Sequence, residues 1–125
     1  MTREPLAVVI EPRSSLAGTI AEVLRHRGYE TVTASTHASA AGLVEHLAHV
    51  DFLAAAVPAP GEDRTGAYLE KAREKNPGMA IVIMLSDPDE RAEDAPPDVV
   101  RIIKPFGLEV LESAIDLARG KAGHG

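Results

Sequence analysis

The chain has 125 residues, of which 45% are hydrophobic, 26% are charged and none is cysteine, and its net charge is −6. These values fit a single soluble domain with its own core, and the lack of cysteine excludes disulfides, thiol catalysis and cysteine-based metal sites. The negative charge and an aromatic content of only 3% argue against nucleic-acid binding, which needs a cationic surface or stacking side chains.

The first part of the chain joins a strand-length apolar run to a segment of helical period. Leu6–Ile10 is continuously apolar, which is typical of a strand buried on both faces, and it is too short for a signal peptide or a membrane span. We therefore expect a cytoplasmic protein that does not bind membranes. Ser14–Gly28 predicts a helix that is capped by Ser14 or Ser15 and ends at Gly28 in the left-handed conformation.

The middle of the chain repeats this alternation. Tyr29–Ala34 and Asp51–Val57 predict the second and third strands, and helical segments follow at Thr36–Val50 and at about Thr65–Lys75. Ala80–Leu85 is the most hydrophobic run of the chain and predicts the fourth strand.

The segment 86–98 that follows is acidic and ends in two adjacent prolines, so it has room for about two helical turns at most. Val99–Ile103 then predicts the fifth strand and Gly107–Arg119 the final helix, which gives one domain over 1–119 and a flexible tail over 120–125. The tail is where a linker to an output domain would begin.

Strands that alternate with helices imply a parallel sheet, because parallel neighbours need crossover connections. Right-handed crossovers place helices on both faces of such a sheet. The fold class is therefore α/β, a doubly wound five-stranded parallel sheet in a three-layer α/β/α sandwich with a shortened fourth helix.

The order of elements and four motifs resemble the receiver domain of two-component response regulators, over Leu6 to about Arg119. In chain order the motifs are "RHRGYETVTA", "DFLAAAVPAPG", "VIMLSD" and "IIKPFGLEVLESAI". The last contains the Lys-Pro-Phe sequence that opens the final helix in this family. The resemblance implies a flavodoxin-like sandwich and a place in bacterial signal transduction.

The resemblance also implies a phosphorylation site at the carboxyl edge of the sheet, and this sequence keeps only part of it. The family lysine matches Lys104 and the family hydroxyl matches Ser86, whereas the acidic pair that holds Mg²⁺ matches Glu11 and Pro12. The phosphoacceptor aspartate matches Ala56, whose methyl group cannot be a nucleophile. We therefore expect a degenerate phosphorylation pocket with no catalytic residue, no metal site, no cofactor and weak or absent Mg²⁺ binding.

The resemblance also carries expectations for the switch position, the lysine and the peptide bond before Pro105. The family's switch position, commonly aromatic, is Arg101, so the usual aromatic rotamer switch has no moving part. Lys104, with no aspartate beside it, is expected to pair directly with Glu11, and Ser86 then caps the following turn. The resemblance implies a cis peptide before Pro105.

These features favour a pseudo-receiver, which is a phosphorylation-independent protein–protein interaction or regulatory module rather than an enzyme. The expected partner surface combines the fourth helix, the fifth strand and the last helix, and its charged residues are Asp89, Glu90, Glu93 and Arg101. The expected partners are proteins such as a histidine kinase or an output domain, and a homodimer through this face or through the first and last helices fits the same family pattern.

Two other classes of function stay open. A conventional receiver with a relocated acceptor would use Glu62 or Asp63, because Asp51 lies at the far end of its strand, roughly 15 Å or more from Lys104. A small-ligand sensor would bind an anion or metabolite in the vacated space around Ala56, Ser86 and Lys104. The lack of glycine in "EPRSS" argues against a nucleotide or flavin.

One histidine pair also has the spacing of metal ligands. His46 and His49 lie three residues apart in the second predicted helix, and two such residues without a third ligand are usually surface histidines.

Overall fold

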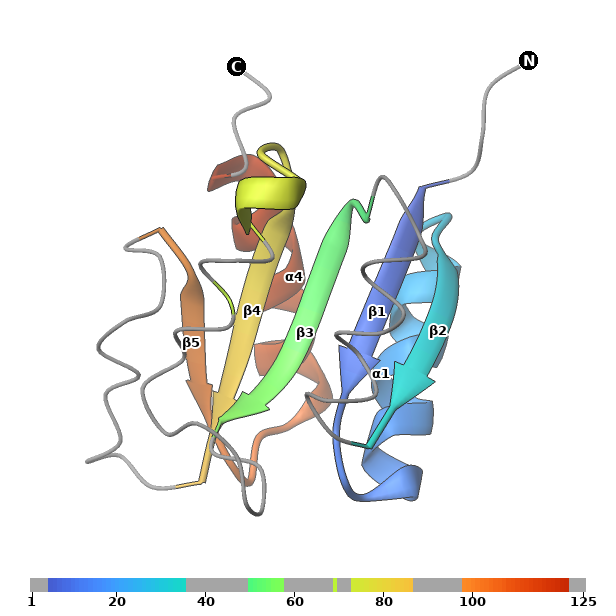
Figure 1. Cartoon of the computed structure of the whole chain (residues 1–125). Helices are drawn as coiled ribbons and strands as arrows, with labels where there is room; N and C mark the ends of the chain where they lie inside the picture. Colours follow the sequence, from blue (N-terminus) through green and yellow to red (C-terminus); the bar gives the residue numbers. More distant parts are fainter. Residues whose placement is uncertain (1–4, 36–49, 58–68, 70–72, 87–97, 122–125) are drawn as a thin grey trace.

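The computed structural model describes residues 5–35, 50–57, 69, 73–86 and 98–121. Parallel strands form a single sheet in the order β2-β1-β3-β4-β5, as Figure 1 shows. The predicted doubly wound α/β fold with five parallel strands is confirmed. The elements are β1 (Leu6–Ile10), α1 (Ser14–His26), β2 (Glu30–Ala34), β3 (Phe52–Val57), β4 (Ala80–Leu85), β5 (Val100–Ile103) and α4 (Leu108–Lys121).

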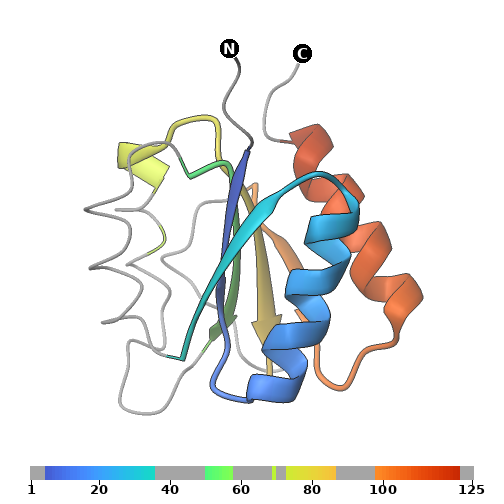
Figure 2. The same ribbon diagram turned by 90° about the vertical axis from the view of Figure 1, so that its right-hand side faces the viewer.

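The sheet separates two hydrophobic clusters. The helices α1 and α4 lie side by side on one face, where Figure 2 shows them in blue and orange-red. Along β3, Phe52, Ala54 and Ala56 belong to the cluster beneath these helices, while Leu53 and Ala55 belong to the cluster on the opposite face. This alternation follows from the two-residue period of a strand and explains why both faces of the strand are apolar.

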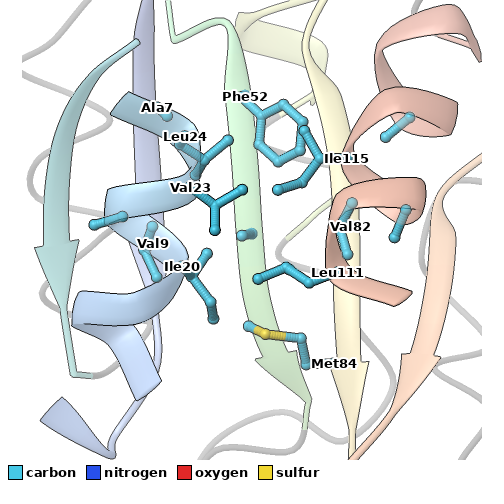
Figure 3. Close-up of a cluster of buried hydrophobic side chains, with 14 of the residues drawn as sticks. Ala7, Val9, Ile20, Val23, Leu24, Phe52, Val82, Met84, Leu111 and Ile115 are labelled. Atoms are coloured by element: carbon cyan, nitrogen blue, oxygen red, sulfur yellow. The ribbon is translucent and has the colours of Figure 1, made fainter. Parts of the chain in front are cut away.

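The cluster under α1 and α4 holds the two helices on the sheet. Figure 3 shows Ile20 and Leu24 from α1 and Leu111 and Ile115 from α4 converging over β3 and β4. Phe52 is fully buried at its centre, and burial of a side chain of this size contributes roughly 2 kcal/mol relative to exposure. Neither α1 nor α4, the helices described in full here, is long and apolar enough to cross a bilayer.

The start of α1 differs from the prediction. The N-cap residue is Arg13, whose carbonyl accepts the Ala17 N–H at 2.9 Å, and no side chain caps the helix. Ser14 and Ser15 were expected as caps but already lie within the first turn, because the helical hydrogen bonds begin one residue earlier. The other end agrees with the sequence, since Gly28 follows the helix with a φ of 93°.

The end of α4 also differs. The helix continues to Lys121 and so includes the first two residues of the predicted tail. Its last turn is held in place by Ala118, which is buried, and by Arg119, whose guanidinium lies 5.6 Å from the centre of the Tyr29 ring. These contacts hold the backbone beyond Leu117, the last large apolar residue, so the helix extends further along the chain than the hydrophobic pattern predicts.

Three other expectations fall wholly or partly outside the described residues. These are the helix over 36–49, the shortened helix within 87–97 and the tail over 122–125. For the helix expected at about Thr65–Lys75, Leu69 and Arg73–Lys75 are described and helical, and Leu69 packs in the second cluster.

Candidate functional site

The predicted pocket residues meet at the carboxyl edge of the sheet. Glu11 directly follows β1, Ser86 follows β4, and Lys104 follows β5. Ala56 is the second-last residue of β3 and lies opposite Met84 of β4 in the parallel register. The ends of parallel strands at such an edge are where α/β proteins usually place their binding sites. Topology therefore brings together residues separated by most of the chain.

An ion pair between Glu11 and Lys104 occupies this edge. Lys104 Nζ donates to Glu11 Oε1 at 2.6 Å, which confirms the pair expected from the sequence. The other oxygen, Oε2, accepts the backbone N–H of Arg13 at 3.0 Å. The Glu11 side chain is 0% exposed and that of Lys104 is 20% exposed. Both carboxylate oxygens are thus engaged, and the charge is buried with its partner.

Ala56 takes the position that the resemblance assigns to the phosphoacceptor. It is 2% exposed and belongs to the hydrophobic cluster beneath α1 and α4. A buried methyl group has no lone pair with which to attack phosphorus. At this position the strand contributes packing rather than chemistry.

The described donor set does not fit Mg²⁺. This ion prefers oxygen ligands in octahedral geometry, usually one or two carboxylates together with water and phosphate. The Glu11 oxygens are occupied by Lys104 and Arg13, Pro12 has no side-chain donor, and Ala56 has none either. Within the described ranges, no three His, Asp or Glu side chains are grouped in a way that could hold a metal.

The remaining predicted residues are spread over different surfaces or lie outside the description. Ser86 is exposed at the end of β4, and Arg101 is exposed on β5 opposite Ile83 of β4. The peptide bond before Pro105 is cis, as the resemblance implied. The acidic residues Asp89, Glu90 and Glu93, the loop acids Glu62 and Asp63, and His46 and His49 all lie outside the described residues.

A groove lies beside the ion pair, close to where the small-ligand hypothesis placed a pocket. It has a volume of about 700 Å³, and its described lining comes from the start of α1, the end of β4 and the segment between β5 and α4. Ser86 and Lys104 are in this lining, but Ala56 is not. The pocket hypothesised around Ala56, Ser86 and Lys104 is thus displaced toward α1, because Ala56 is buried in the core.

Asp51 lies at the amino edge of the sheet, as predicted. Its carboxylate Oδ2 accepts the backbone N–H of Leu6 at 2.8 Å, directly before β1 and β3 begin. This hydrogen bond links the beginnings of the neighbouring strands β1 and β3, at the edge of the sheet opposite Glu11 and Lys104.

No family model matches the chain, and no curated protein matches it. Solved structures do resemble it. A response regulator receiver protein from Sinorhizobium medicae has a TM-score of 0.79 at 19% identity, with 95% of this chain and 98% of that chain covered. The signal receiver domain of an HD domain-containing protein from Pseudomonas fluorescens has a TM-score of 0.76 at 19% identity, with coverage of 98% and 91%.

A third structure shows the same likeness. It is a response regulator from Burkholderia pseudomallei that was solved with a phosphorylated aspartic acid, and it has a TM-score of 0.73 at 18% identity, with 95% of this chain and 72% of that chain covered. At these identities the likeness shows the fold alone. The chain has the α/β fold of response-regulator receiver domains.

Proposed function

We propose that this chain is a pseudo-receiver: a regulatory module of signal transduction that works by protein–protein contact and independently of phosphorylation. The single observation that carries the proposal is the carboxyl edge of the sheet, where Ala56 is buried and Glu11 and Lys104 bind each other. Receiver-fold domains generally act on protein partners, and this chain retains the fold without the reactive group.

Phosphoryl transfer to an aspartate needs a carboxylate nucleophile and cations that neutralise the charge developing on phosphorus. Here the nucleophile position holds a methyl group. The lysine that would bind phosphoryl oxygens already donates to Glu11 at 2.6 Å. A phosphoryl group at this edge would compete with the buried Glu11 carboxylate for Lys104, and Ala56 offers no atom to which phosphorus could bond. These features support a module without its own catalytic activity.

The surface of β5 and α4 supports a binding role. Leu108, Val110 and Leu117 of α4 are 56%, 49% and 53% exposed, and Ile103 at the end of β5 is 37% exposed. A shallow groove of about 410 Å³ runs between the two elements, with a mainly apolar lining. Of these residues, Val110 and Leu117 line the groove, and neighbouring exposed apolar side chains commonly mark contact surfaces. Partners that fit are a histidine kinase, an output domain or a second copy of this chain. Arg101 alternates along β5 with the groove-lining residues Val100 and Ile102, so its side chain lies toward the other face of the sheet.

The proposal is tested by affinity capture from native cells with the intact protein, with and without Mg²⁺ and acetyl phosphate. We expect the same partners to be recovered under both conditions, because no covalent switch operates. The double substitution Val110→Lys and Leu117→Lys is expected to reduce recovery, since it places charge in the apolar groove. Charge reversal at Asp89, Glu90 and Glu93 tests whether the acidic segment contributes to the same surface.

Glu22→Lys is the matched control, because it also adds positive charge but lies on the exposed face of α1. It should recover partners as the wild type does. Recovery that appears only after treatment with acetyl phosphate would contradict phosphorylation independence. Equal recovery by all variants would contradict the assignment of the surface.

A further inference from the structure

The groove beside Lys104 has the chemistry of a small-molecule site. Its volume of about 700 Å³ lies within the range of ligand pockets. Arg13 and Lys104 contribute positive charge from two different elements, and Ser15 and Ser86 contribute hydroxyl groups. No acidic side chain is present among the lining residues that the structure describes. The described lining is therefore positively charged, although the whole chain has a net charge of −6.

The two cations differ in whether a carboxylate already binds them. Lys104 already donates one N–H to Glu11, but an ammonium group has three donors and its side chain is 20% exposed. The guanidinium of Arg13 has no ion-pair or hydrogen-bond partner among the described residues, and only its backbone N–H is used, by Glu11. Glu11 cancels one of the two positive charges. Counted over the residues that the structure describes, the groove therefore carries a net charge of about +1, which matches one monoanionic group.

The remaining wall is apolar and fixed. Leu16 and Phe106 are partly buried and pack against the cluster beneath α1 and α4, so the core holds their orientation. Pro105 lies beside them in the lining. Thr19 offers no donor, because its hydroxyl already donates to the carbonyl of Ser15 at 3.1 Å. The groove thus combines cationic residues with apolar ones, among them the aromatic side chain of Phe106.

We infer that this groove binds a small aromatic carboxylate. The carboxylate accepts hydrogen bonds from the Arg13 guanidinium and the free N–H groups of Lys104, and the aromatic body packs against Leu16 and Phe106. A single carboxylate balances the local charge, whereas a phosphate monoester with nearly two negative charges exceeds it. Binding needs no acceptor aspartate and no covalent step. The inference does not depend on the proposed function, because a ligand could bind here whether or not the chain is phosphorylated.

The test is a titration of the intact ¹⁵N-labelled protein with 2-naphthoate, followed by amide chemical shifts. We expect saturable shifts at Ser15, Leu16 and Phe106, with none at Gly78, which precedes β4 at the opposite, amino edge of the sheet. Neutral 2-naphthamide, of the same shape, should bind at least tenfold more weakly, because it lacks the charge that Arg13 and Lys104 recognise. Inorganic phosphate in place of 2-naphthoate measures binding of an anion without the apolar body.

Variants locate the site. Arg13→Gln should weaken 2-naphthoate binding roughly tenfold, since one charged donor is lost. Arg25→Gln is the matched control: it makes the same charge change on the same helix, away from the groove, and should leave the affinity unchanged. Circular dichroism checks that both variants keep the fold.

Three results would overturn the inference. The first is the absence of shifts at the groove residues during the titration. The second is equal affinity for the carboxylate and its amide, or equal weakening by Arg13→Gln and Arg25→Gln, either of which shows non-specific contact. The third is tight binding of inorganic phosphate without binding of 2-naphthoate, which would replace the carboxylate with a phosphate ligand.

Discussion

At the scale of single residues, the length of the Glu11 side chain decides how the carboxyl edge is neutralised. The residue follows β1 and reaches Lys104, which follows β5, although β3 and β4 lie between these two strands in the sheet. The same carboxylate also accepts the N–H of Arg13 at the start of α1. One side chain therefore connects the ends of two strands and the start of a helix.

The two halves of this ion pair should differ in their effect on stability. Lys104→Met leaves a fully buried carboxylate without its cation and should lower the free energy of unfolding by about 3 kcal/mol. Glu11→Gln leaves an ammonium group that still reaches water and should cost only about 1 kcal/mol. Urea unfolding at neutral pH measures both values. Arg101→Met, at an exposed position, is the control and should change stability by less than about 0.5 kcal/mol.

Equal losses for Lys104→Met and Glu11→Gln would contradict this account, because they would mean that the buried carboxylate is not the more costly charge to leave without a partner.

The ion pair could be expected from the sequence because the resemblance places both residues at one edge. The bond from Glu11 to the Arg13 N–H could not, since it depends on the path of the chain between β1 and α1.

Tyr29 should make stability sensitive to alkaline pH. Burial raises the pKa of the Tyr29 hydroxyl above its ordinary value of 10.0, against a smaller opposing effect of the nearby Arg119 charge. The folded state thus favours the neutral phenol. The stabilisation is complete below about pH 10 and is lost as the pH rises through that value toward the raised pKa, because the unfolded chain ionises first.

The measurement is the free energy of unfolding of the wild type and of Tyr29→Phe between about pH 8 and pH 11. The variant keeps the edge-to-face contact with Phe52, whose ring centre lies 5.6 Å away, but has no proton to lose. We expect the wild type to lose more stability than the variant across this range. Parallel curves would contradict the role assigned to the buried phenol.

At the scale of elements, α1 offers two glycines whose substitution by alanine should have opposite effects. Gly28 follows the helix with a φ of 93°, which strains any residue with a Cβ, so Gly28→Ala should cost about 1 kcal/mol. Gly18 lies within the helix, and an added Cβ would meet no heavy atom within 4 Å, so Gly18→Ala should stabilise the protein by up to about 1 kcal/mol.

Thermal unfolding followed by circular dichroism compares the two variants directly. A fall in melting temperature for Gly28→Ala and a rise for Gly18→Ala are expected. Changes of the same sign would show that backbone conformation at these positions is not what decides stability. The open space around Gly18 also shows that this glycine is not required for close packing of the helix on the sheet.

The same scale shows what sequence patterns can and cannot predict. The ends of β1 and β4 match the prediction because both strands are continuously apolar and end abruptly at polar residues. The start of α1 and the end of α4 were misplaced, because backbone hydrogen bonding at Arg13 and the stacking of Arg119 on Tyr29 decide them rather than hydrophobic period. The hypothesised pocket included Ala56, whereas the groove beside Lys104 excludes it and is lined instead by the start of α1, which the sequence pattern does not place against the segment after β5.

At the scale of the whole molecule, the chain keeps the fold of receiver domains but has different residues at the carboxyl edge of its sheet. The sheet order, the two clusters and the paired helices agree with the α/β class that the sequence indicated. The Burkholderia pseudomallei response regulator with this fold carries a phosphorylated aspartic acid, whereas here the carboxyl edge holds an ion pair and a buried alanine. A chain built in this way can present a surface continuously, and the exposed apolar residues of α4 are where we expect that surface to lie.

The most direct test of this account is the intact mass of the protein after incubation with Mg²⁺ and acetyl phosphate, with acid quenching to preserve acyl phosphates. We predict no added phosphoryl mass on the wild type. The double variant Pro12→Asp and Ala56→Asp restores the missing carboxylates and is the positive control, provided that circular dichroism shows it folded. A phosphoryl group recovered on the wild-type chain, at any residue, would contradict the claim that this receiver fold works without phosphorylation.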